Sequence, residues 1–127
     1  MSTTSIDLIT HDPASDEFVL YLVEDGPWSE TEEAMQADLR RVQTRLYDAI
    51  DIVIDGQLLE RYPESEGKAV RIQVDSPSGV PAALDRLVKR FQQRLATDTG
   101  IKASIVQANI KGLRIVTGHE MGRFRHS

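Results

Sequence analysis

Two short apolar runs lie near the start of the chain, at Ile6–Ile9 and at Glu17–Val23. The six residues His11–Asp16, which lie between the two runs, are rich in Asp, Pro and Ser, which turns prefer. Two such runs joined by a turn-rich segment are typical of a β-hairpin with a long loop. We therefore expect the chain to begin with two neighbouring strands.

A long amphipathic helix is predicted next. Ser29 and Glu32 have the spacing of a capping box, in which each side chain satisfies a free backbone N–H group at a helix start. Apolar residues then recur at steps of three and four, the period of one helix face. These residues are Met35, Leu39, Val42, Leu46, Ile50 and Val53.

Residues 50–55 allow two interpretations. Their alternation of Ile with Asp and Val would also suit a strand. A continuous helix places Asp48, Asp51 and Asp55 on one solvated stripe, so we favour a helix that continues to about Glu60. Tyr62 and Pro63 end the element in either case.

The second half of the chain alternates strands and helices. Val70–Asp75 alternates apolar with polar residues, which predicts a strand with Arg71 and Gln73 on an open polar face. A helix is expected over about Pro81–Ala96. The remaining expectations are a strand at Ile101–Val106, and a candidate last strand at Leu113–Thr117 paired with it through the turn at Asn109–Gly112.

These elements predict an α+β fold, specifically an α/β two-layer sandwich. The expected order is strand, strand, helix, strand, helix, strand, with an optional extra C-terminal strand. We expect a mixed β-sheet with both helices on one face. Residues 1–117 would form a single domain, and residues 118–127 a flexible basic tail.

Composition narrows the class of protein. With 127 residues, 40% of them hydrophobic and 28% charged, the chain reads as one soluble domain. The absence of cysteine excludes disulfides, thiolate nucleophiles and cysteine-ligated zinc. The longest apolar run, Phe18–Val23, is too short for a membrane span, and the N-terminus has no secretory signal. We expect a cytoplasmic protein with no membrane association.

Four segments together resemble a family of small bacterial proteins known only as a domain of unknown function. They are Ile6–Pro13 (IDLITHDP), Glu24–Trp28 (EDGPW), Asp55–Pro63 (DGQLLERYP) and Lys68–Ile72 (KAVRI). The resemblance would cover about residues 5–107 and implies a bacterial source. It lends no activity, cofactor or catalytic residue, but it favours a helical context for the DGQL run.

Motifs for catalysis or metal binding are weak. Gly67 and Lys68 do not complete a phosphate-binding loop, because the pattern lacks its first glycine and its Ser or Thr. Metal ligands gather at His11–Glu17, yet their spacing matches no calcium loop, and turn geometry explains them better. We predict no metal, no cofactor and no catalytic residues, and we lean against an enzyme.

The loop after the third strand is the best candidate for a small anionic ligand. Asp75, Ser76, Ser78 and Gly79 lie between the end of a strand and the start of a helix, where backbone N–H groups and hydroxyls can hold an anion. The alternative is a connecting loop whose Ser and Gly serve only capping and backbone geometry.

Charge divides the chain in two. Residues 1–67 hold 16 acidic and 4 basic residues, whereas residues 68–127 hold 4 acidic and 11 basic ones. Four basic residues share one face of the second helix and form a candidate basic surface: Arg86, Lys89, Arg90 and Arg94. Such a stripe could contact the phosphate backbone of a nucleic acid. The pI near 5.1 and the lack of any nucleic-acid-binding motif argue against nucleic acid as the partner.

The second strand motivates the leading hypothesis. Phe18, Leu20 and Leu22 would point to one face, and Val19, Tyr21 and Val23 to the other, so both faces need cover. We predict a non-enzymatic protein-interaction or self-associating module, with a homodimer formed through Val19, Tyr21 and Val23. In the competing account, Ile110–Val116 folds across that face.

Overall fold

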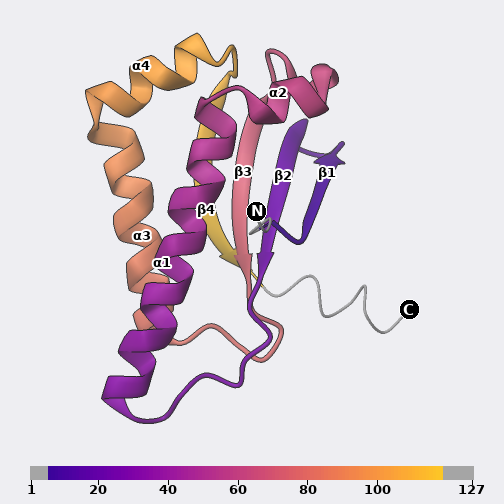
Figure 1. Cartoon of the computed structure of the whole chain (residues 1–127). Helices are drawn as coiled ribbons and strands as arrows, with labels where there is room; N and C mark the ends of the chain where they lie inside the picture. The colour runs from indigo at the N-terminus through magenta and orange to yellow at the C-terminus, as the bar shows by residue number, and fades with distance from the viewer. Residues whose placement is uncertain (1–5, 119–127) are drawn as a thin grey trace.

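The computed structural model describes residues 6–118 (Figure 1). In chain order its elements are β1 (Leu8–Asp12), β2 (Glu17–Val23), α1 (Glu32–Ile54), α2 (Gln57–Arg61), the short 3₁₀ helix η1 (Pro63–Ser65), β3 (Ala69–Asp75), α3 (Ala82–Thr97), α4 (Thr99–Gln107) and β4 (Gly112–Gly118). The protein is therefore a mixed α and β fold with a mixed sheet, as the sequence predicts. The predicted tail beyond Gly118 lies outside the described residues.

The four strands lie in the order β1-β2-β3-β4. β1 and β2 form the predicted antiparallel hairpin, whereas β2, β3 and β4 run parallel to one another. β1 extends further than expected, because His11 pairs with Phe18 and Asp12 with Glu17. The turn that joins the two strands is correspondingly shorter than the sequence suggests.

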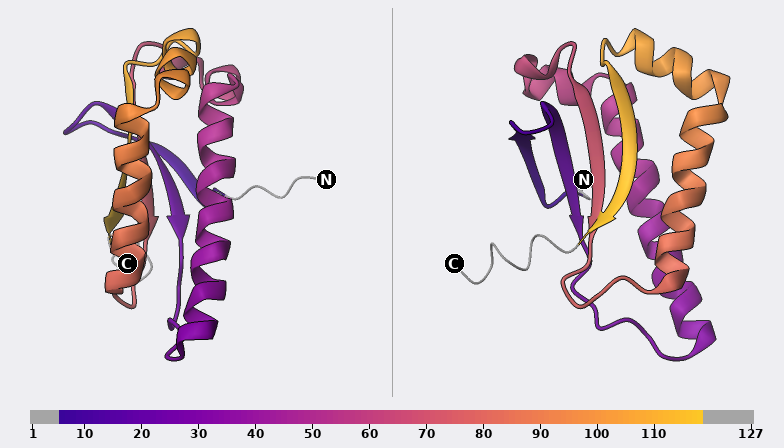
Figure 2. Two further views of the ribbon diagram at one scale, coloured as in Figure 1. Left: turned by 90° about the vertical axis from the view of Figure 1, so that its left-hand side faces the viewer. Right: turned by 180° about the vertical axis from the view of Figure 1, so that it is seen from behind.

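Two crossover connections build the helical layer. α1 connects β2 to β3, and α3 with α4 connects β3 to β4. Both connections step in the same direction along the sheet. Figure 2 (right) shows α1 behind the sheet and α3 beside β4, the strand at the edge of the sheet.

The core lies between these helices and the sheet. Leu20, Ile72 and Ile115 are neighbours in register and at most 2% exposed. The helices contribute Val42, Leu46, Ala49, Ile50 and Val53 from α1, and Leu84, Leu87, Val88, Phe91 and Leu95 from α3. Most of these are the positions that the three- and four-residue steps predict.

The first helix begins later and ends earlier than predicted. Its N-cap is Thr31, whose Oγ1 accepts a hydrogen bond from the backbone N–H of Ala34 at 3.2 Å. Ser29 is not the cap, because its own N–H donates to Asp38 Oδ2 at 3.1 Å. α1 ends at Ile54, since Gly56 adopts a left-handed φ of 92°, and α2 follows. The strand interpretation of residues 50–55 is wrong.

The predicted strand at Ile101–Val106 is also wrong, because these residues lie in α4. The Asp98 carboxylate caps this helix by accepting from the Ile101 N–H at 3.0 Å. Ile101 and Ile105, four residues apart, pack on the core, while Val106 is 76% exposed. β4 therefore pairs with β3 in parallel rather than with a neighbouring hairpin strand.

The predicted open polar face of β3 is buried. Arg71 is 8% and Gln73 4% exposed, and Asp75 has no exposed surface. Arg71 and Gln73 lie directly opposite Arg114 and Val116 of β4. Buried polar groups require hydrogen-bond partners. Arg71 finds one in Glu17, and Gln73 finds one in Asp75.

Candidate functional site

One carboxylate bridges two neighbouring arginines on the sheet. Arg71 and Arg114 lie opposite each other in register, which places two positive charges side by side. Glu17 Oε1 accepts from Arg71 Nη1 at 2.9 Å, and Glu17 Oε2 accepts from Arg114 Nε at 2.7 Å. The hydrogen bonds from Arg114 lower the pKa of Glu17 from 4.5 to about 2. The cluster is therefore a structural ion-pair network that joins β2, β3 and β4.

The same contacts explain the acidic hairpin segment. Asp12 Oδ2 lies 3.3 Å from Arg71 Nη1, and His11 Nε2 lies 2.8 Å from Asp16 Oδ1. The potential metal ligands are thus bound to side chains of the protein. Among residues 6–118, no three His, Asp or Glu side chains gather in a way that could hold a metal ion.

The residues predicted for self-association do not form an exposed patch. Val19 has no exposed surface, Tyr21 is 6% exposed, and Val23 is partly buried. The segment Ile110–Val116 does not cross this face either, because most of it is strand β4 at the sheet edge. The burial of these side chains gives no support to an interface at this face.

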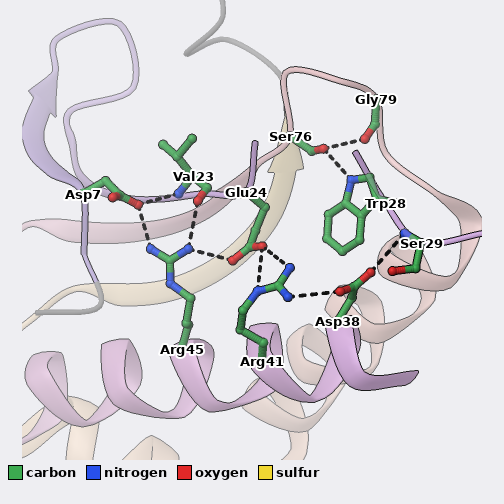
Figure 3. Close-up of polar contacts among 10 residues, drawn as sticks. All are labelled: Asp7, Val23, Glu24, Trp28, Ser29, Asp38, Arg41, Arg45, Ser76 and Gly79. Atoms are coloured by element: carbon green, nitrogen blue, oxygen red, sulfur yellow. Dashed lines mark hydrogen bonds and ion pairs between the residues drawn. The ribbon is translucent and has the colours of Figure 1, made fainter. Parts of the chain in front are cut away.

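The predicted ligand loop is tied to the first half of the chain (Figure 3). Ser76 has no exposed surface, and its Oγ accepts from Trp28 Nε1 at 2.8 Å and donates to the Gly79 carbonyl at 2.5 Å. Asp75 Oδ1 accepts from Gln73 Nε2 at 2.8 Å. The hydroxyl and carboxylate expected to meet a ligand thus serve the loop itself.

A cavity of about 340 Å³ does lie beside this loop. Its lining is mostly apolar and comprises Pro27, Trp28, Ser78, Gly79, Val80 and Pro81. Ser78 is the one hydroxyl in this lining, and Pro81 caps α3 without a side-chain hydrogen bond. Among the described lining residues only Ser78 offers a side-chain hydroxyl, and anion binding at this loop stays a prediction.

A second ion-pair network fixes the end of β2 to α1 (Figure 3). Glu24 is 6% exposed and lies between two arginines of α1. Its Oε1 accepts from Arg41 Nη2 at 2.6 Å, and its Oε2 accepts from Arg45 Nη1 at 2.7 Å. Arg45 also reaches Asp7 Oδ2 at 2.6 Å, and Arg41 reaches Asp38 Oδ1 at 3.0 Å. Both arginines are thus used within the fold.

The outer side of α1 and α3 carries a shallow groove of about 230 Å³. Tyr47, which is 44% exposed, stands over Phe91 with ring centroids 5.1 Å apart in an edge-on arrangement. The complete lining is Gln43, Tyr47, Leu87, Arg90, Phe91 and Arg94. We call this surface the α1–α3 face and include in it Asp51, which is exposed one turn beyond Tyr47.

Two arginines of this face have no internal role. Arg90 and Arg94 are exposed and make no ion pair or side-chain hydrogen bond with any residue in 6–118, and the same holds for Arg86. The fourth predicted basic residue, Lys89, pairs with Asp85 at 2.9 Å. In contrast to Arg41 and Arg71, these arginines are free to meet another molecule.

The sequence predicts half of this face. The period of α3 predicts that its arginines are exposed, but the sequence does not identify Tyr47 and Asp51 as their neighbours. Tyr47 directly follows the core residue Leu46, so it flanks the apolar stripe of α1. A large aromatic residue at the edge of an apolar stripe is the sequence signal for this face. Its neighbour, Phe91 of α3, is known only from the folded structure.

Comparison of the chain with family models, curated proteins and solved structures gave no match. The resemblance to a bacterial family thus stays a prediction. Within residues 6–118, no helix has both the length and the apolar character needed to cross a bilayer.

Proposed function

We propose that the protein is a non-enzymatic self-associating module, and that the α1–α3 face binds a second copy of the chain. The observation that carries this proposal is an exposed aromatic ring, Tyr47, flanked by unpaired Arg90 and Arg94. Tyrosine and arginine are enriched among the residues that dominate binding energy at interfaces. A face that holds both without internal partners is suited to association.

Charge complementarity favours a second copy as the occupant. Because β2, β3 and β4 are parallel, the crossover helices α1 and α3 run in the same direction. Tyr47 contacts Phe91, so Asp51 and Arg94, one turn further on, lie at similar heights on the two helices. They form no ion pair with each other. One side of the face therefore presents an unused carboxylate and the other an unused guanidinium.

A two-fold axis along the groove would use both charges. Such an axis places the α1 side of one copy against the α3 side of the other. Asp51 of each copy then faces Arg94 of the other copy. The two Tyr47 rings then bury their exposed surface near the centre. This replaces the interface predicted at Val19, Tyr21 and Val23, which burial within the chain removes.

Charge exchange tests the proposal. Arg94→Glu and Asp51→Arg should each weaken association roughly tenfold, because each puts like charges opposite one another. The double variant Asp51→Arg with Arg94→Glu should restore it. Lys102→Glu, with the same charge change at an exposed site on α4, is the control. Failure of the double variant to restore association, in sedimentation velocity, would contradict the proposed pairing.

Nucleic acid is the competing partner for the same arginines. In that case Arg86, Arg90 and Arg94 would contact phosphates, and binding would weaken steeply with salt. Retention of the wild-type protein on immobilised duplex DNA at about 0.15 M salt, with loss on Arg94→Glu, would favour this reading. We expect no retention.

A further inference from the structure

Another cavity lies beside the β1–β2 hairpin. Its volume is about 360 Å³. The lining comes from the hairpin and from the segment around η1 and comprises Ile9, Thr10, His11, Phe18, Tyr62, Glu64 and Lys68. It shares no residue with the α1–α3 face, so a ligand here would be independent of self-association through that face.

Aromatic rings form one wall of this cavity. The ring centroids of His11 and Phe18 are 5.4 Å apart, and those of Phe18 and Tyr62 are 6.3 Å apart. With Ile9 they offer an apolar and π-rich surface. A surface of this kind favours a flat apolar body or a cation beside the ring faces.

The nitrogen groups of the cavity, on Lys68 and His11, are already bound to one carboxylate. Lys68 Nζ lies 3.0 Å from Asp16 Oδ1 and 3.1 Å from Asp16 Oδ2, and His11 Nε2 lies 2.8 Å from Asp16 Oδ1. Hydrogen bonds from His11 and Lys68 hold the pKa of Asp16 below its ordinary value, so Asp16 is ionised. An anionic ligand would have to compete with this carboxylate for both groups.

The unpaired polar groups of the described lining are one carboxylate, which accepts, and two hydroxyls, which can donate or accept. The Glu64 carboxylate is exposed and has no hydrogen-bond or ion-pair partner within residues 6–118. The hydroxyls of Thr10 and Tyr62 have no side-chain partner there either. A ligand that satisfies this cavity needs hydrogen-bond donors and positive charge near Glu64, together with an apolar body against Phe18 and Tyr62.

We propose that this cavity binds a small apolar amine, with the ammonium group on Glu64 and the apolar part against Phe18 and Tyr62. Phenethylamine is the probe, and hydrocinnamate, with a similar ring and chain but the opposite charge, is the matched control ligand. Amide proton–nitrogen correlation spectra of the whole chain report where each compound binds.

Phenethylamine should shift the amides of Thr10, His11 and Lys68, with a Kd in about the low millimolar range expected for a compound of its size. Hydrocinnamate should bind roughly tenfold more weakly. Glu64→Gln should remove most of that preference, whereas Glu60→Gln, an exposed carboxylate of α2 outside the lining, should leave it unchanged. Equal affinity for the two compounds, shifts located elsewhere, no shifts, or equal effects of the two variants would overturn the proposal.

Discussion

Glu17 and Arg114 are 97 positions apart in the chain, yet Arg114 Nε donates to Glu17 Oε2 at 2.7 Å and Arg114 Nη2 donates to Glu17 Oε1 at 2.9 Å. Glu17 is 6% exposed and also binds Arg71. This carboxylate therefore joins the three parallel strands through side chains in addition to their backbone ladder.

The depressed pKa of Glu17 makes the fold sensitive to acid. Its pKa is lowered from 4.5 to about 2 in the folded protein, so the unfolded chain takes up this proton first as the pH falls. The stabilisation is complete above about pH 5 and is lost between about pH 5 and pH 2.

Glu17→Gln should remove most of that pH dependence and lower the free energy of unfolding by about 2 kcal/mol at neutral pH, because among residues 6–118 Arg71 then keeps only Asp12 as an ion-pair partner. Urea denaturation at several pH values measures both effects. An unchanged acid dependence in Glu17→Gln would show that other carboxylates dominate it.

The Ser76 hydroxyl is expected to be structural. Ser76→Ala should cost about 1–3 kcal/mol of unfolding free energy, because it leaves the Trp28 N–H and the Gly79 carbonyl without their partner. Ser78→Ala, an exposed position in the same loop, should change stability by less than about 0.5 kcal/mol. Similar losses for both variants would contradict the assigned hydrogen bonds.

α3 protects the edge of the sheet at β4. The backbone N–H of Ile115 donates to Gln92 Oε1 at 2.7 Å, so a side chain occupies a donor that an edge strand would otherwise leave free. Gln92→Ala should speed hydrogen exchange of the Ile115 amide and cost about 1 kcal/mol. Gln93→Ala, at the exposed neighbouring position, is the control. Unchanged exchange at Ile115 in Gln92→Ala would exclude this role.

Local periodicity explains which elements could be predicted. The stripe from Val42 to Val53 and the stripe of α3 both identify core faces, because each repeats over several turns. The prediction for residues 101–106 is wrong because a short apolar segment suits a strand or a helix, and the decisive signal is the helix cap at Asp98.

The polar sites depended on distant pairings that one sequence does not reveal. Arg71 was expected on an open face because its partner Glu17 comes from another strand, 54 positions away. Ser76 was expected to meet a ligand, whereas its hydroxyl binds Trp28, 48 positions away. Tyr47 and Arg94 became one surface only when α1 and α3 were placed together.

The mass of the wild-type protein in solution tests the central claim most directly. Light scattering over a range of micromolar concentrations should show a mass that rises from that of one chain, 14.2 kDa, towards twice that value. Tyr47→Glu should hold the mass at one chain, because it places a charge at the centre of the interface. A wild-type mass of 14.2 kDa at every concentration, or a dimer that Tyr47→Glu leaves intact, would contradict self-association through the α1–α3 face.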